Sequence, residues 1–100
     1  MKLQIHSIHF DADKKLLEFI QKKLTKLETF FDRIIDGEVF LRLEKGDFTR
    51  ENKVVEVKIN LPGHSLFVKE QSISFESATD IALDRLVAQI KKYKEKLIKH

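Results

Sequence analysis

Residues 53–70, KVVEVKINLPGHSLFVKE, decide how this chain folds. Apolar and polar side chains alternate in KVVEVKINL (53–61) and in SLFVKE (65–70), which is typical of strands with one buried face. The side chains predicted to point inward are Val55, Val57, Ile59, Leu61, Leu66 and Val68. Pro62 and Gly63 fit the central pair of a type II turn, because proline presets the first φ and glycine tolerates the positive second φ. The segment therefore predicts two strands joined by a tight turn.

Two more strands are predicted upstream of this segment. EVFLRLE (38–44) alternates with Val39, Leu41 and Leu43 facing inward, and KLQIHSI (2–8) does so with Leu3 and Ile5. The stretch KGDFTREN (45–52) separates the strand at 38–44 from the one at 53–61.

Two segments have the helical period instead. From residue 14 to about residue 34, apolar residues recur at steps of three and four: Leu16, Leu17, Ile20, Leu24, Leu27, Phe31 and Ile34. Asp13 is the predicted N-cap of this helix, and Asp36–Gly37 is predicted to stop it. The second helix is predicted from about residue 74, with its stripe on Ala78, Ala82, Leu86, Ile90, Tyr93 and Leu97.

The predicted order of elements is β-α-β-β-β-α, an α+β fold. A four-stranded sheet with both helices on one face, in two layers, would bury every apolar stripe. The 100 residues are enough for one domain, 1–100. No repeat or linker divides them.

Composition narrows the function. The chain has no cysteine, which excludes disulfides and thiolate metal sites, and it has neither a signal-peptide core nor a membrane-length apolar run. We therefore expect a soluble protein of the cytoplasm. The net charge of +3 is unevenly distributed: six Lys or Arg and one acidic residue lie between Arg85 and the end of the chain. Such asymmetry favours a polyanionic partner.

Cationic residues form a row on each predicted helix. At about 100° per residue, spacings of 7, 4 and 7 place one row within an arc of roughly 40° on the first helix. Its members are Lys15, Lys22, Lys26 and Arg33. A second row on the last helix falls within roughly 60°. It contains Arg85, Lys92, Lys96 and Lys99. One such row is ordinary on a solvated helix face, but two on neighbouring helices also suit the phosphates of a nucleic acid.

The opposite face of the sheet offers an alternative site. Phe40, Phe67 and His6 are predicted to point outward there, beside Arg42, Lys58 and Lys69. Exposed aromatic rings of this kind can stack on bases or contact a protein. Glu38, Glu44 and Glu56 point the same way and would repel phosphate.

Other chemistries have little support. The histidines lack the spacing and the partner ligands of a metal site, and there is no phosphate-binding glycine loop or nucleophile elbow. No catalytic residue, metal, cofactor or small-molecule substrate is therefore predicted. Both apolar helix stripes are needed to cover the sheet, so no membrane contact is predicted either.

Two segments resemble the bacterial ribosome hibernation-promoting factors, also known as the ribosome-associated translation inhibitor or sigma-54 modulation protein family. KLETFFDRI (26–34) is similar to the end of their first helix, and SFESATDIALDRLVAQIKKYKEKLIKH (74–100) is similar to their last helix. The resemblance implies a fold like the double-stranded-RNA-binding domain. It also implies a protein that binds small-subunit rRNA in the mRNA and tRNA channel and blocks translation under stress.

The resemblance also assigns residues. The basic positions of the family pattern fall on Lys23, Lys26, Arg85, Lys92, Lys94 and Lys96. Two positions depart from the pattern: Glu76 replaces a tyrosine, and Ala88 replaces a basic residue for which Lys91 is expected to compensate. The end of the chain at His100 resembles the short form of the family, and we expect a monomer when it is free. Two alternatives stay open: a structured-RNA-binding module that is not specific to ribosomes, and a protein-interaction domain using the open sheet face.

Overall fold

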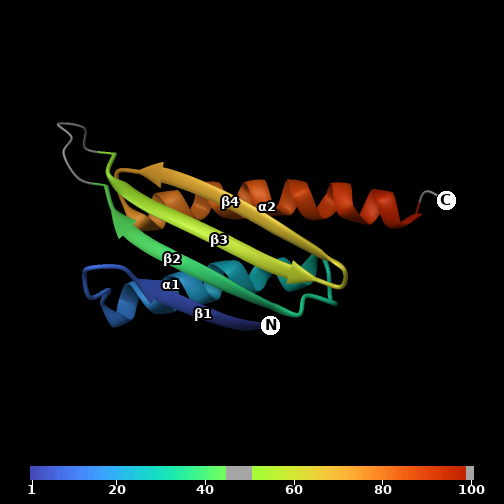
Figure 1. The fold of residues 1–100 in the computed structure, drawn as a ribbon, viewed down its shortest axis with the longest axis horizontal. Coiled ribbons are helices and arrows are strands. Elements are labelled where there is room, and N and C mark those ends of the chain that lie inside the picture. Colours follow the sequence, from blue (N-terminus) through green and yellow to red (C-terminus); the bar gives the residue numbers. More distant parts are fainter. Residues whose placement is uncertain (45–50, 99–100) are drawn as a thin grey trace.

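The structure is a computed structural model and describes residues 1–44 and 51–98. Within those ranges the chain forms four strands, two α-helices and one short 3₁₀ helix (Figure 1). In chain order they are β1 (Lys2–Ser7), α1 (Lys14–Thr25), η1 (Lys26–Thr29), β2 (Asp36–Leu43), β3 (Lys53–Leu61), β4 (His64–Ser72) and α2 (Phe75–Ile98). The predicted order and the α+β class are confirmed.

The four strands form one sheet in the order β1-β2-β3-β4. β1 and β2 are parallel because α1 carries the chain back between them, and the other two pairs are antiparallel. Pro62 and Gly63 form the tight turn between β3 and β4, and Gly63 has the positive φ of 71° that its place in a type II turn requires.

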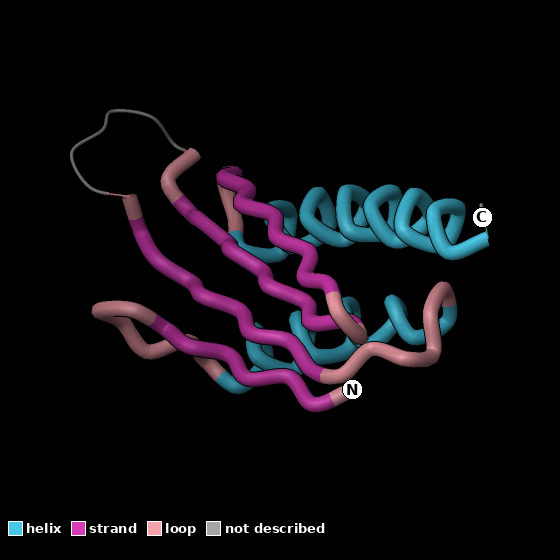
Figure 2. Tube along the Cα trace, turned by 45° about the vertical axis from the view of Figure 1, so that its right-hand side comes forward, coloured by secondary structure: helices cyan, strands magenta, loops and turns pink. Residues whose placement is uncertain are grey.

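Both helices cover the same face of the sheet and run in the same direction (Figures 1 and 2). Ile20 and Leu24 of α1 and Leu86 and Ile90 of α2 are completely buried. They meet a sheet face whose inward side chains are also buried, namely Val39, Leu41, Val55, Val57, Ile59, Leu61, Leu66 and Val68. The two-layer arrangement predicted from the apolar stripes is therefore confirmed.

The first helix begins where it was predicted to begin but ends earlier. Asp13 is its N-cap, and the Asp13 Oδ1 atom accepts a hydrogen bond from the Leu16 N–H at 2.8 Å. The helix ends at Thr25 instead of continuing to about residue 34, and η1 follows it. Two threonine hydroxyls bond back to backbone carbonyls here, Thr25 to Gln21 at 2.5 Å and Thr29 to Lys26 at 2.7 Å. Such bonds compete with the regular helical pattern.

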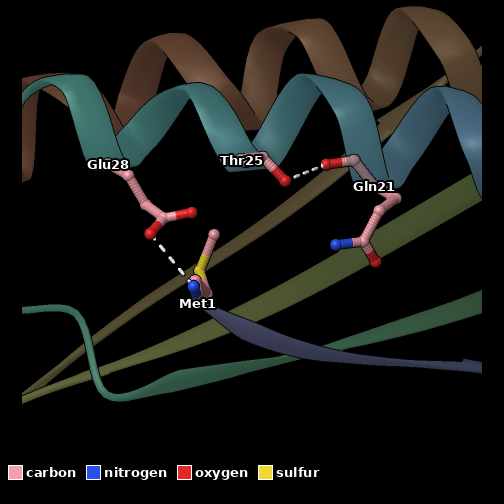
Figure 3. A network of polar contacts seen from close by, with 4 residues as sticks. All are labelled: Met1, Gln21, Thr25 and Glu28. Atoms are coloured by element: carbon pink, nitrogen blue, oxygen red, sulfur yellow. Dashed lines mark hydrogen bonds and ion pairs between the residues drawn. The ribbon is translucent and has the colours of Figure 1, made fainter.

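The 3₁₀ helix is tied to the start of β1. The Met1 ammonium group lies 3.0 Å from the Glu28 Oε2 atom, and Figure 3 shows the two groups directed at each other across the gap between β1 and η1. The Met1 side chain is among the partly buried groups that pack against the core. The contact therefore joins η1 to the edge strand of the sheet.

Two local predictions about β2 were wrong. Asp36 and Gly37 do not end a helix but open the strand. A Cβ atom on Gly37 would lie 2.8 Å from the Ile59 Cδ1 atom and 3.0 Å from the Leu3 Cδ1 atom, so the missing side chain makes room for its neighbours. Leu43, predicted to point into the core, is 44% exposed because it is the last residue of its strand.

The N-cap of α1 provides a test of local stability. We expect Asp13→Ala to lower the free energy of unfolding by about 1 kcal/mol, because the Leu16 N–H loses its acceptor. For a domain of this size that corresponds to a fall of about 4–8 °C in the melting temperature. Thermal unfolding followed by circular dichroism measures it, and exposed Asp11→Ala is the matched control. Equal melting temperatures for the two variants would contradict the capping role.

Candidate nucleic-acid interface

The first predicted cationic row is only partly formed. Lys15 and Lys22 are exposed on α1, and Lys26 is exposed at the start of η1. They lie opposite the buried residues Ile20 and Leu24, as their spacing requires. Arg33 does not belong to this row, because the helix has ended before it is reached. It is an exposed residue of the loop between η1 and β2.

The row on α2 faces β4 and not α1. The Arg85 Nε atom lies 2.8 Å from Glu70 Oε2 on β4. Lys92 and Lys96 line a hollow between α2 and the β3–β4 turn. Gln89, which lies between Arg85 and Lys92 along α2, donates from its side chain to the Phe67 carbonyl of β4 at 3.3 Å. The two predicted rows therefore do not merge into one continuous surface. Lys99, the last member of the row, lies outside the described residues.

Three other lysines lie between the helices. The Lys23 Nζ atom is 3.3 Å from Asp80 Oδ1 on α2 and 5.4 Å from the centre of the Phe19 ring. Lys94 of α2 donates to the Phe30 carbonyl at 2.9 Å, and the Lys91 Nζ atom lies 5.8 Å from the centre of the Phe30 ring. These side chains join α1, η1 and α2 as well as adding charge.

Ion pairing divides the candidate residues into two groups. Lys23 and Arg85 each have a carboxylate partner. Within residues 1–44 and 51–98, no carboxylate comes within ion-pair distance of the other described candidates, which are Lys15, Lys22, Lys26, Arg33, Lys91, Lys92, Lys94 and Lys96. Their charges are available to an external anion. Sequence spacing could not separate the paired from the unpaired cations. Each paired cation meets a carboxylate on a different element, Asp80 of α2 for Lys23 and Glu70 of β4 for Arg85.

Most of the unpaired cations gather toward one end of the molecule, whereas Lys15, in the first turn of α1, lies at the other. Because α1 and α2 run in the same direction, their C-terminal halves lie at the same end (Figure 1). The first turns of α2 are acidic, with Glu76, Asp80 and Asp84. Its last turns carry Lys91, Lys92, Lys94 and Lys96. The arrangement makes one end of the helical layer strongly cationic.

The open face of the sheet has a different charge pattern. His6 stacks on Phe40 with ring centres 4.9 Å apart and contacts Glu38 at 3.2 Å. Arg42 and Glu56 form an ion pair on neighbouring strands. Phe67, predicted to be exposed, is 55% exposed. Lys58 and Lys69 are also exposed on this face, and among the described residues neither has a carboxylate within ion-pair distance. Glu38, Glu44 and Glu56 lie among these cations, so this face has mixed charge and offers less to a polyanion than the helical layer does.

Sequence reasoning missed a pair of stacked rings beside the α2 row. His64 at the start of β4 stacks on Tyr93 of α2, with ring centres 5.2 Å apart and an angle of 13° between the planes. They line the hollow that contains Lys92 and Lys96, which has a volume of about 570 Å³. The sequence does indicate where His64 lies, because the Pro62–Gly63 turn places the following residue at the end of the sheet. It does not indicate that Tyr93 of the last helix lies opposite His64.

Other kinds of site find no support in the part of the chain that the structure describes. No three His, Asp or Glu side chains there are grouped so that they could hold a metal ion. None of the helices in residues 1–44 and 51–98 is long and apolar enough to cross a membrane.

Solved structures share this fold. A ribosomal subunit interface protein from Coxiella burnetii has a TM-score of 0.82 and 23% identity, over 95% of this chain and 99% of that one. The N-terminal domain of Protein Y from Thermus thermophilus has a TM-score of 0.79 and 24% identity, over 93% and 99%.

Sequence comparison identifies the family. The ribosome hibernation promoting factor of Escherichia coli (strain K12) is 30% identical over 100 residues and is covered over its full length. The protein of the same name from Pseudomonas putida is 28% identical over 96 residues, which is 96% of this chain and 89% of that protein. Residues 3–98 match the profile of the family described as "Sigma 54 modulation protein / S30EA ribosomal protein". The chain therefore belongs to the Sigma 54 modulation protein / S30EA ribosomal protein family, as the two similar segments predicted.

Proposed function

We propose that this protein is a ribosome hibernation factor that binds the rRNA of the small subunit in the channel for mRNA and tRNA. It inhibits translation by occupying that channel under stress or in stationary phase. Family membership supports the hibernation role, since the relatives from Escherichia coli and Pseudomonas putida are named for it. The finer proposal, binding to rRNA in the channel, depends on the cationic end of the helical layer.

The unpaired cations are the observation that carries the proposal. Lys22 and Lys26 lie on one side of the helical layer, Lys92 and Lys96 on the other, and Lys91 and Lys94 between them. Lysine neutralises phosphate and releases condensed counterions, and such binding reads the backbone instead of the bases. A group of cations on rigid helices therefore suits folded RNA.

The two paired cations are expected to contribute less. Glu70, the partner of Arg85, has a side chain that is only 12% exposed, so part of the arginine charge is already neutralised. The Lys23–Asp80 pair has side chains that are 31% and 53% exposed, and a surface pair of this kind contributes at most about 1 kcal/mol. Lys23 can therefore turn to a phosphate at little cost. The Arg85 side chain is 67% exposed and can also meet a phosphate, but there it competes with the largely buried Glu70.

Inhibition by occupancy requires a rigid body more than a reactive group. Both helices are packed on the sheet, and the central side chains of these contacts, such as Ile20 and Leu86, are completely buried. The molecule measures 49 × 25 × 19 Å along its principal axes. A body of this size, held by its cationic end, would exclude mRNA and tRNA from the same space, and no catalytic step is needed.

Binding experiments separate the proposal from its two alternatives. A structured-RNA-binding module that is not specific to ribosomes would use the same cations but would bind free duplex RNA as tightly as ribosomes. A protein-interaction domain on the open sheet face would depend on Phe40 and Phe67 and not on the helical lysines.

Neutralising three unpaired lysines tests the interface. We expect the triple variant Lys22→Gln, Lys26→Gln, Lys92→Gln to bind small subunits more weakly in co-sedimentation at several salt concentrations. Loss of three phosphate contacts should reduce the slope of log affinity against log salt by about 2 to 3. The matched control removes the same charge from the sheet side, with Lys2→Gln, Lys58→Gln and Lys69→Gln. The proposed interface is wrong if the two triple variants lose affinity equally.

Competition with tRNA tests the position on the subunit. We expect saturating protein to prevent mRNA-programmed small subunits from retaining labelled tRNA on filters, because both need the same space. The helical triple variant should compete only at higher concentration. Simultaneous retention of the protein and the tRNA would place the binding site outside the channel.

A further inference from the structure

The hollow beside the α2 row has a fixed aromatic wall. The Tyr93 ring has three partners. It stacks on His64, it makes a T-shaped contact with Phe31 with ring centres 5.4 Å apart, and its hydroxyl donates to the Pro62 carbonyl at 3.1 Å. His64 is exposed, so it continues this stack outward. The ring therefore presents an aromatic surface whose position the neighbouring elements determine.

Cations line the same hollow. Lys92 and Lys96 are four residues apart on α2, so they lie on one face of the helix, about 6 Å apart along its axis. Both are exposed, and within the described ranges neither has a carboxylate in ion-pair distance. A ligand that reaches the His64 ring would bring any negative charge it carries next to two ammonium groups.

The floor of the hollow is the free edge of the sheet. β4 is the last strand, and Gln89 of α2 bonds to the Phe67 carbonyl on the side away from β3. The hollow of about 570 Å³ lies within the range of ligand pockets in proteins, about 300 to 1,000 Å³. It has the size and the polar edge groups to accept a planar heterocycle with its sugar and phosphate.

We propose that this hollow binds one unpaired nucleotide of a bound RNA, with the base stacked on His64 and the flanking phosphates on Lys92 and Lys96. The inference rests on the proposed function, since it specifies how the RNA is held. Base stacking on an aromatic ring tolerates any base and adds about 1–3 kcal/mol. The helical lysines then provide charge, and the hollow selects an extruded base over a fully paired helix.

The other histidine stack of the protein provides a matched control. His6 and Phe40 stack on the open sheet face with ring centres 4.9 Å apart, much as His64 and Tyr93 do. His6, however, contacts the Glu38 carboxylate, which repels phosphate. A nucleotide should therefore distinguish the two stacks even though their rings are alike.

Tyr93 is itself the reporter for the test. The chain has one tyrosine and no tryptophan, so its intrinsic fluorescence comes from this ring. The full chain is titrated at low salt with a seven-residue oligoadenylate and with an oligomer of equal length and charge whose sugars are abasic. We expect the oligoadenylate to change the Tyr93 emission and to bind roughly five- to 150-fold more tightly than the abasic oligomer. Equal affinities would overturn the proposal, because only phosphate would then be recognised.

Variants separate stacking from charge. His64→Ala should abolish the preference for the base-bearing oligomer, whereas His64→Phe, which keeps a ring, should retain it. His6→Ala should bind both oligomers like the unmodified protein. Because His64 is exposed, its replacement should leave the circular dichroism spectrum unchanged, and a folded His64→Ala variant that keeps the full preference overturns the proposal.

Co-sedimentation with small subunits separates this inference from the proposed function. Ribosome binding by the unmodified protein together with equal affinities for the two oligomers leaves the function standing and removes the nucleotide site. A preference for the base-bearing oligomer without ribosome binding supports the nucleotide site and contradicts the proposed function. If His64→Ala weakens ribosome binding while neither oligomer affects Tyr93, the hollow holds a protein segment and the inference is wrong.

Discussion

The burial of two apolar helix stripes against one sheet face is the constraint on which this structure depends. β3 lies in the middle of that face with Val55, Val57 and Ile59 completely buried, and Ile20 and Leu86 cover it from the two helices. Truncating a buried leucine or isoleucine of this kind to alanine typically costs about 2–5 kcal/mol, which is a large part of the stability of a small domain. The apolar stripes fix the rotation of each helix, so they also decide which lysines face the solvent.

Several features could be predicted from the sequence because local chemistry determines them. The bounds of β3, the Asp13 cap and the Pro62–Gly63 turn follow from side-chain alternation and from backbone preferences. The end of α1 could not be predicted in this way. Leu27 and Phe31 are buried at helical spacing although the chain has left the α-helix. Periodicity reports which side chains are buried, and a 3₁₀ turn followed by a loop can bury the same ones.

The exposure of most candidate cations was predictable from the sequence, but the surfaces that they form were not. Helical spacing identified exposed cations correctly on α1 and α2, yet the direction in which the α2 row faces depends on where β4 lies. Arg85 and Lys23 are paired through Glu70 and Asp80, which come from other elements. Tertiary contacts of this kind have no local signal, and for the same reason the stack of His64 on Tyr93 was not foreseen.

The parallel course of the two helices has a consequence for how the molecule approaches its partner. α2 changes from acidic first turns to basic last turns. Lys22 and Lys23 of α1 and Lys26 of η1 lie at the same basic end, and they outnumber Lys14 and Lys15 at the start of α1. The molecule therefore has a permanent electric dipole moment along its long axis. In the field of a polyanion such a body experiences a torque before any contact forms, and it rotates so that its basic end arrives first. Orientation of this kind raises the rate of productive encounters more than it raises the final affinity.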